Sequence, residues 1–259
     1  MSASSYGIKR IKKRWTCLQA PDNGLKTFHY LLIKMIRIFA GYDPREAIGY
    51  HVFCQSVIER TKEPVAITPF YGKQRDGTNA FIYQRFLVPY FTGFRGKAIF
   101  MDASDMLMLG DINDLNKLFD PTKAVQVVKH EYKTQHAKKY IGTAMEAKNE
   151  DYPRKNWSSL ILWNCEHPRN NVLTPDYIDD HSGSELHRFN WLPESLIGEL
   201  PKQWNVLVGE QHNPNAKIAH YTLGIPEFDH YADCDYSKQW FNTKSRMLDG
   251  LIKMKELTN

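Results

Sequence analysis

An apolar run that leads directly into two carboxylates is the clearest candidate for chemistry in this sequence. Residues 97–101 read Lys-Ala-Ile-Phe-Met, and Asp102 and Asp105 follow before the chain returns to apolar residues at Met106. Buried carboxylates are costly unless they are paired or bind a cation. Two of them at the end of a strand suit a hard divalent ion with oxygen ligands, such as Mg²⁺ or Mn²⁺. The alternative is that one Asp caps a turn while the other is solvated.

The elements that must position these acids follow a strand–helix–strand pattern. Residues 36–40 predict a short apolar strand that stops at Gly41-Tyr42-Asp43-Pro44. Asp43 is a suitable helix cap and Pro44 suits a first helical turn. The helix is predicted through residues 47–58, and residues 64–69 predict the second strand. Such alternation is typical of an α/β layer with parallel strands, whose ligands gather at the carboxyl ends of those strands.

The rest of the chain continues this pattern. We predict further strands at residues 97–101, 124–129 and 158–163, a helix around 81–91, and a closing helix at 237–257. Residues 131–154 are polar, rich in Lys and poorly periodic, which favours a mobile loop over the site. The expected fold is therefore a single α/β domain with a mostly parallel central sheet flanked by helices.

The acidic segment resembles a known family. Residues 98–114 are similar to the metal-binding segment of GT-A glycosyltransferases of family 8, the glycogenin-like and bacterial lipopolysaccharide enzymes, which carry Asp-x-Asp after a strand and then a Gly-Asp-Ile-like turn. Here the spacing is longer by one residue. Asp102 matches the first acid counted from the strand, and Asp105 matches the second counted back from Gly110. Ser104 is the alternative second ligand, but a hydroxyl is the weaker one.

Other segments resemble the same family in the same order. Those that match a family motif are residues 39–43, the strand end that holds the nucleotide base; 83–89, the helix whose Arg reaches the donor; 200–205, Leu-Pro-x-x-Trp-Asn; and 218–226, the late His-x-x-Gly element. Residues 152–165 look closer still to an uncharacterised glycosyltransferase-like group related to family 8. Together these segments span roughly residues 36 to 240.

The resemblance implies a function and a set of site residues. A GT-A-like domain over residues 35–259 would move a sugar from a nucleoside diphosphate sugar, in this family a UDP sugar, to an acceptor hydroxyl with retention. Its metal would be Mn²⁺ or Mg²⁺, held by Asp102, Asp105 and His220. The donor-binding residues implied or suggested by position are Gly41, Tyr42, Asp43, Arg85, Asp102, Lys155, Asn156 and Gly224.

Most of these residues also have an ordinary structural interpretation. His220 is a candidate ligand because Mn²⁺ tolerates imidazole beside carboxylates, whereas a lone His more often makes a structural hydrogen bond. Arg85 is either a cation near the phosphates or a surface ion-pair partner. Tyr42 either stacks on a base or simply packs. Lys155 and Asn156 either hold sugar hydroxyls or cap the entry to a strand.

The chain also departs from the family pattern. A Lys usually follows the late Gly and contacts the diphosphate, but Ile225 and Pro226 stand there, so that Lys155 or the pair Lys138 and Lys139 would have to serve. The family's Asp-Gln pair near the reacting sugar has no clear counterpart. Glu194 is the nearest acid and the catalytic candidate, with an exposed, non-catalytic Glu as the alternative.

These departures leave two other functions open. One is a non-catalytic module that binds nucleotides or carbohydrates on the same fold. The other is a sugar nucleotidyltransferase, although residues 41–46 offer little of the Gly-rich, basic loop that such an enzyme needs after its first strand.

Charge and composition limit the partners. The 259 residues carry a net charge of +5, of which residues 1–34 contribute +6 from seven bases and one acid, leaving −1 for the remainder. A nucleic-acid partner is therefore not expected for the folded domain. The basic extension at 1–34 is either a solvated leader or a peripheral contact for anionic lipid. No apolar run is long enough to predict a membrane span. Four scattered Cys residues predict reduced thiols in a cytoplasmic protein.

Overall fold

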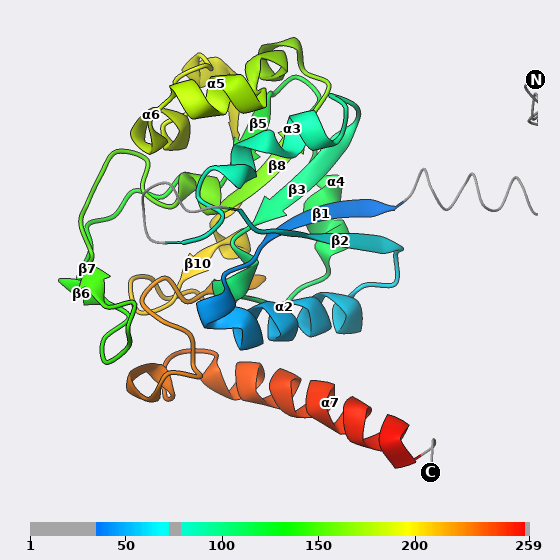
Figure 1. The fold of residues 1–259 in the computed structure, drawn as a ribbon, viewed down its shortest axis with the longest axis vertical. Coiled ribbons are helices and arrows are strands. Elements are labelled where there is room, and N and C mark those ends of the chain that lie inside the picture. The colour runs from blue at the N-terminus through cyan, green and yellow to red at the C-terminus, as the bar shows by residue number, and fades with distance from the viewer. Residues whose placement is uncertain (1–34, 73–78, 257–259) are drawn as a thin grey trace, which may run out of the picture. The chain divides into compact units, whose positions relative to one another are not determined.

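The computed structural model describes residues 35–72 and 79–256, with side chains described as far as residue 250 (Figure 1). The predicted basic extension at 1–34 lies outside these residues. Among the described helices, none is long and apolar enough to cross a membrane.

A six-stranded sheet forms the centre of the fold. Its strand order is β2-β1-β3-β8-β5-β9. The strands are β1 (Ile36–Gly41), β2 (Val65–Phe70), β3 (Lys97–Met101), β5 (Val125–Val127), β8 (Leu160–Asn164) and β9 (Ile197–Glu199). β8 runs antiparallel to both of its neighbours, and the other five strands share one direction. The predicted α/β domain with a mostly parallel sheet is confirmed.

The sheet is buried on both faces because its central strands are apolar at successive positions. In β3, Ala98 and Phe100 join one hydrophobic core while Ile99 and Met101 join the other, as the alternation of side chains along a strand requires. Helix α2 (Ala47–Arg60) covers the second face through residues such as Phe53. On the opposite face lie α3 (Val88–Phe91), α5 (Pro175–Asp180) and α6 (Gly183–His187) (Figure 1).

Local sequence signals explain where several helices begin. Asp43 accepts a hydrogen bond from the Arg45 amide and caps a 3-10 turn at residues 44–46, which leads into α2. The predicted helix at 81–91 is instead a 3-10 turn at 84–87 followed by the single turn of α3. Pro89 has no amide hydrogen to donate to the Arg85 carbonyl, so a continuous α-helix is not available there.

A second, smaller sheet brings distant segments together. It consists of β10 (Val206–Leu207), β11 (Ile218–His220) and β4 (Met106–Met108), in that order. β4 and β11 are antiparallel, and His220 lies opposite Met106 in their register. Because β4 directly follows the acidic turn, this pairing carries His220 to that turn.

The remaining elements lie around these sheets. They are α4 (Ile112–Lys117), α7 (Ser237–Glu256) and a hairpin of β6 (Lys138–Lys139) and β7 (Ala147–Lys148). The α7 helix packs on α2, and its Trp240 is fully buried.

Candidate functional site

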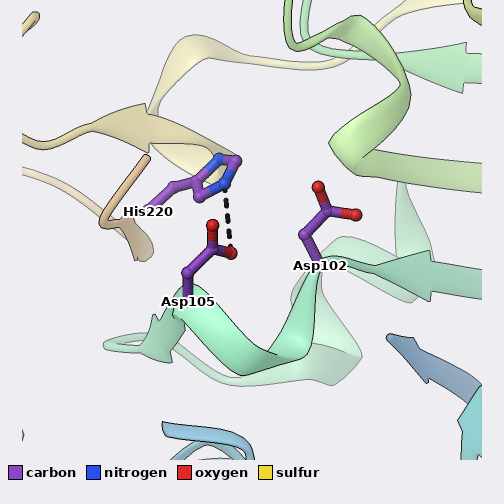
Figure 2. A group of neighbouring side chains, drawn as sticks. All are labelled: Asp102, Asp105 and His220. Atoms are coloured by element: carbon purple, nitrogen blue, oxygen red, sulfur yellow. Dashed lines mark ion pairs between the residues drawn. The ribbon is translucent and has the colours of Figure 1, made fainter. Parts of the chain in front are cut away.

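Asp102, Asp105 and His220 form one cluster at the carboxyl end of β3. One ligand atom from each residue lies within 4.8 Å of the other two, and all three residues are buried. Asp102 follows the last residue of β3, Asp105 ends the 3-10 turn at residues 103–105, and His220 is the last residue of β11. Figure 2 shows the His220 ring above the Asp105 carboxylate, with the Asp102 side chain next to them.

The 3-10 turn brings two acids that are three residues apart in the sequence to the same side of the chain. A 3-10 helix has three residues per turn, so side chains at positions i and i+3 lie above one another. The Asp105 amide donates to the Asp102 carbonyl at 3.2 Å, which closes such a turn. Compared with Asp-x-Asp, the extra residue is therefore accommodated by the turn, and both carboxylates lie on the same side of it.

Ser104, the alternative second ligand, makes its contacts elsewhere. Its hydroxyl donates to the Gly41 carbonyl at 3.2 Å and accepts from the Asp43 amide at 2.9 Å. The side chain is fully buried and ties the acidic turn to the end of β1. Ser104 thus positions the turn, and its oxygen is not part of the cluster.

A buried arginine compensates part of the negative charge. Arg85 Nη1 lies 2.8 Å from Asp102 Oδ1, and the same nitrogen donates to the Ser158 carbonyl at 3.0 Å. The guanidinium carbon is 5.0 Å from the centre of the Phe100 ring. Burial raises the pKa of Asp102 to about 6, although the Arg85 charge acts in the opposite direction. Burial therefore disfavours the ionised form of the Asp102 carboxyl group.

The orientation of His220 follows from its hydrogen bonds. Its Nδ1 lies 2.8 Å from Asn205 Oδ1, and Asn205 Nδ2 donates to Ser159 Oγ at 2.9 Å. With the amide nitrogen committed to Ser159, the amide oxygen must accept from His220 Nδ1–H. In the neutral ring Nε2 then carries the lone pair, and it lies 3.3 Å from Asp105 Oδ1. This second contact of a histidine fixes the nitrogen that faces a metal.

The cluster fits a divalent cation. Within the part of the chain that the structure describes, neither Asp102 Oδ1 nor Asp105 Oδ1 accepts a hydrogen bond, and both atoms are buried. Their contacts with Arg85 and His220 are ion pairs without hydrogen-bond geometry. Two buried carboxylates this close repel each other, so a cation between them and the imidazole would be stabilising. Two carboxylates and one imidazole are a suitable donor set for Mn²⁺.

A cavity of about 580 Å³ opens onto the cluster. One part of its wall comes from the sheet and its turns and another from the segment 131–154. The third part is the start of α6. Its described lining residues are Asn79, Ile82, Arg85, Asp102, Asp105, Lys139, Tyr140, Lys148–Glu150, Tyr152, Lys155, Asn156, Ser158, Ser159, Ser182–Ser184, His187, Arg188, His220 and Thr222. Such a cavity is large enough for a small-molecule ligand.

Three of the predicted donor-binding residues line this cavity beside Asp102. Arg85 is one of them. Lys155 Nζ donates to Asn149 Oδ1 at 2.7 Å, and Asn156 Nδ2 donates to the Tyr132 hydroxyl at 2.9 Å. The structure thus brings together residues from two segments that are about seventy positions apart in the sequence.

The predicted residues at the end of β1 are not among the described lining residues. A Cβ at Gly41 would lie 2.5 Å from the Phe81 ring, so glycine lets that ring pack on the strand. The Tyr42 ring meets Tyr50 edge-on, with ring centres 5.1 Å apart. Asp43 is fully buried. Burial raises its pKa, but hydrogen bonds from Arg45 outweigh that effect and the pKa is lowered.

Gly224 and Glu194 also lie outside the described lining. Gly224 has φ +150°, and a Cβ there would be 2.3 Å from the Tyr231 ring, so the missing side chain makes room for that ring. Glu194 accepts from Lys129 Nζ at 2.7 Å and from Arg154 Nη2 at 2.6 Å. Its carboxylate is more than half exposed. Packing of the Tyr231 ring thus explains the glycine at position 224, and the two ion pairs explain the position of the Glu194 carboxylate.

Sequence reasoning missed several residues at this site. Asn205 stands in the Leu-Pro-x-x-Trp-Asn segment, but nothing in its spacing from His220 indicated a hydrogen bond. His187 Nδ1 lies 2.5 Å from Ser158 Oγ, and burial lowers its pKa well below the ordinary value. Lys139 was not missed, but it was named together with Lys138 and Lys155, and nothing in the sequence distinguishes the three; in the structure Lys139 and Lys155 line the cavity.

The segment 131–154 was predicted to be a mobile loop over the site. It does line the cavity, and polar contacts fix it to the rest of the domain. The buried Glu210 carboxylate accepts from Thr134 Oγ at 2.6 Å, the Gln135 amide at 2.8 Å and Asn149 Nδ2 at 3.1 Å. A single carboxylate therefore joins both ends of the hairpin region.

Comparison with known proteins gives one clear relative in sequence. No profile of a known protein family matches the chain. Protein CDI of Arabidopsis thaliana is 38% identical over 227 residues, an alignment that covers 81% of this chain and 86% of that protein.

Solved structures with a similar fold are glycosyltransferases. Galactosyltransferase LgtC, in complex with donor and acceptor sugar analogs, has a TM-score of 0.53 and 14% identity, over 82% of this chain and 96% of LgtC. GlyE of Streptococcus pneumoniae TIGR4 has a TM-score of 0.53 and 11% identity over 86% of this chain. The chain spans only 64% of GlyE and 52% of the bifunctional WbbM (TM-score 0.51, 13% identity, 81% of this chain). At these identities the likeness shows a GT-A-like fold.

Proposed function

We propose that this chain, which belongs to the family of Arabidopsis thaliana Protein CDI and has a GT-A-like fold, is a metal-dependent glycosyltransferase. The donor is a nucleoside diphosphate sugar, specifically a UDP sugar, and the acceptor is a hydroxyl group. The observation that carries this proposal is the buried Asp102–Asp105–His220 cluster, whose three residues line one cavity.

Each residue of the cluster has a definite part in this proposal. Asp102, Asp105 and His220 Nε2 hold Mn²⁺, or Mg²⁺ in its place. When bound, the metal neutralises charge on the departing diphosphate. Arg85 holds Asp102 in position and adds positive charge beside it. Asn205 keeps the lone pair of His220 on Nε2, toward the acids.

The donor is placed by residues that share the cavity with the cluster. Lys155 and Asn156 are proposed as contacts for the sugar, since both line the same cavity. Residues 41–43 and Gly224 are proposed to shape the donor site through the backbone. At Gly41 and Gly224 the Phe81 and Tyr231 rings occupy the space of a side chain. Retention at the anomeric carbon and membership of family 8 rest on the resemblance of the motifs.

Calorimetric titration of UDP tests this proposal. We expect micromolar binding of UDP with Mn²⁺, loss of that binding with a chelator, and a preference among UDP sugars that points to the substrate. Absence of UDP binding under both conditions would rule out a UDP-sugar donor. GDP and CMP sugars would then be titrated to test other nucleotides.

The position of Glu194 favours a second candidate function. Glu194, the catalytic candidate from the sequence, pairs with Lys129 and Arg154 and is not among the described cavity residues. A non-catalytic nucleotide- or carbohydrate-binding module would therefore fit the same cavity. The two functions differ in turnover. Metal-dependent UDP-sugar binding without hydrolysis and without transfer to a panel of acceptors would favour the binding module.

A further inference from the structure

A serine and a histidine face each other in the cavity, close to the metal cluster. Ser158 Oγ lies 2.5 Å from His187 Nδ1, and both residues line the cavity. Ser158 belongs to the 3-10 turn at residues 157–159 that leads into β8, and His187 is the last residue of α6. The pair therefore joins two elements through residues that are 29 positions apart in the sequence.

The turn at residues 157–159 places the pair next to Asp102. One guanidinium nitrogen of Arg85 links the two, because Nη1 donates to the Ser158 carbonyl at 3.0 Å and lies 2.8 Å from Asp102 Oδ1. In a nucleoside diphosphate sugar, the transferred sugar is bonded directly to the diphosphate that the metal would hold. A polar group one contact away from a metal ligand is therefore well placed to meet that sugar.

Two adjacent serines in this turn have different partners. Ser159 Oγ donates to the Asn156 carbonyl at 2.7 Å and accepts from Asn205 Nδ2 at 2.9 Å. Among the described residues, the Ser158 hydroxyl has His187 as its one hydrogen-bond partner. A hydroxyl has one hydrogen to donate and two lone pairs. Ser158 can therefore make a further hydrogen bond with a ligand in the cavity.

The pair carries no charge at neutral pH. Burial lowers the pKa of His187 well below its ordinary value, and repulsion from the Arg85 guanidinium acts in the same direction. An uncharged imidazole and a hydroxyl attract phosphate much less than a metal ion does. They suit instead the hydroxyl groups of a sugar, each of which can both donate and accept a hydrogen bond.

The opposing explanation is that the pair only fastens α6 to the domain. Other contacts already do this, because Leu186 and Phe189 are buried in the hydrophobic core and the Gly183 amide donates to the Tyr83 hydroxyl at 3.2 Å. Within the described part of the chain, His187 Nε2 is also buried without a hydrogen-bond partner. Such an unpaired nitrogen is destabilising, so an apolar side chain would fasten the helix better.

We propose that Ser158, oriented by His187, makes a hydrogen bond with a hydroxyl group of the transferred sugar and so helps to determine which sugar is bound. This inference rests on the proposed function. His187 is a positioning residue, because its Nδ1 fixes the direction of the Ser158 hydroxyl. A hydroxyl with a fixed direction distinguishes the correct sugar from sugars in which the partner hydroxyl is inverted or missing.

The test compares Ser158→Ala, His187→Phe and the double variant by calorimetry with Mn²⁺. Each protein is titrated with UDP and with UDP-glucose, UDP-galactose, UDP-xylose and UDP-N-acetylglucosamine. In Ser158→Ala, we expect the affinity for the preferred UDP sugar relative to UDP to fall by about 3- to 10-fold, the value of one hydrogen bond. His187→Phe should change this ratio in the same direction. The affinities for UDP and for Mn²⁺ alone should stay within about twofold.

The double variant separates a positioning residue from an independent contact. Because His187 acts through Ser158, the double variant should lose no more than Ser158→Ala does. Additive losses would show that His187 contacts the ligand by itself and would overturn its role as a positioning residue. Phenylalanine at position 187 keeps a ring for the edge-on contact with Phe86, whose ring centre lies 5.2 Å away.

Ser159→Ala is the contrasting variant. It removes a contact of Asn205, the residue that orients the ligand His220. We therefore expect weaker Mn²⁺ binding and an unchanged ratio of UDP-sugar to UDP affinity at saturating Mn²⁺. Thermal melting of all four variants checks that each is folded.

The remaining outcomes overturn the inference. If the ratio is unchanged in Ser158→Ala, the serine does not contact the sugar, while the proposed function stands. The same holds if UDP and UDP-sugar affinities fall by equal factors, because the pair then acts on the metal or on the fold. A parent protein that binds UDP without distinguishing the four UDP sugars also overturns it. A parent protein that binds no UDP with Mn²⁺ overturns the proposed function and this inference with it.

Discussion

Two walls of the cavity are built in different ways. The cluster wall, consisting of Asp102, Asp105 and His220, stands at the ends of β3 and β11 between hydrophobic cores. The hairpin wall, residues 131–154, contains two-residue strands and is joined to the domain by polar contacts around Glu210. The first wall is positioned by packing of the whole domain and the second by a few hydrogen bonds.

This difference leads to a division of labour that can be tested. Changes in the cluster wall should act on metal binding, and therefore on everything that depends on the metal. Changes in the hairpin wall should act on the donor while metal binding is retained. The predictions below test this division, beginning with the change for which the largest effect is expected.

Removing one carboxylate from the cluster wall should have the largest effect. In Asp105→Ala the remaining Asp102 and His220 give only two ligands, so we expect Mn²⁺-dependent UDP binding to fall by more than about 100-fold. Calorimetry with and without a chelator measures this. Asp114→Asn is a matched control, because Asp114 is exposed and pairs with Lys117 at 3.1 Å on the surface. Intact metal-dependent binding in Asp105→Ala would disprove the assigned ligands.

The residue behind His220 should have the next largest effect. In Asn205→Ala the Nδ1–H of His220 loses its acceptor, so the ring is free to take either tautomer. Loss of such a contact typically reduces metal affinity by about 10- to 100-fold. Mn²⁺ titration measures the loss, and Asn205→Asp, which keeps an acceptor oxygen, should restore part of the affinity. Equal Mn²⁺ affinity in Asn205→Ala and the parent protein would show that His220 is oriented by other means.

The pKa of Asp102 makes the cluster wall sensitive to pH. Because burial raises this pKa to about 6, the folded protein holds a proton between roughly pH 4 and 6 that the unfolded chain has already released. The metal-free protein should therefore lose stability as pH rises through this window, by up to the order of 3 kcal/mol. Asp102→Asn should lack this slope in chemical denaturation. Mn²⁺ affinity should rise over the same window, since the metal binds the ionised carboxylate.

A flat stability profile for the parent protein between pH 4 and 6 would contradict this assignment. The same result in the presence of saturating Mn²⁺ would not, because metal binding favours the ionised form and offsets the cost of burying it. The comparison must therefore be made on metal-free protein.

The two walls also differ in how well the sequence predicts them. The apolar residues 98–101, followed by Asp102 and Asp105, predicted a buried strand that ends in a pair of carboxylates. This prediction was possible because both the apolar strand and the spacing of the acids depend on neighbouring residues in the sequence. The one-residue difference from Asp-x-Asp left Ser104 as an alternative, and only its hydrogen bonds to residues 41 and 43 decide the matter.

The hairpin wall carries no comparable pattern. Its strands have two residues each, too short for a hydrophobic period, and the contact that fixes them joins Thr134 to Glu210, 76 positions apart. The sequence therefore identified the polar segment but not its attachment. The same limit applies to Asn205 and His220, whose hydrogen bond depends on the pairing of β10 with β11.

Loosening the hairpin wall should have a moderate effect that spares the metal. Glu210→Gln replaces one acceptor oxygen with an amide group, so at least one of the donors from Thr134, Gln135 and Asn149 loses its partner. We expect faster amide hydrogen exchange across residues 134–149 relative to strand β1, a three- to tenfold loss of UDP affinity at most, of the order of one hydrogen bond, and unchanged Mn²⁺ affinity. A parallel loss of Mn²⁺ affinity would show that the two walls are not independent.

Glu194→Gln should have the smallest effect. Its carboxylate lies between Lys129 and Arg154, whose cationic groups are each 5.3 Å from the centre of the Trp157 ring, so it braces the turn before β8 from outside the cavity. Exposed ion pairs contribute at most about 1 kcal/mol each, and we expect turnover and UDP affinity to stay within about threefold. A general acid or base at this position would instead cost about 100-fold or more in turnover. A loss of that size with donor binding intact would assign Glu194 to the chemical step, and it would place part of the active site beyond both walls of the cavity.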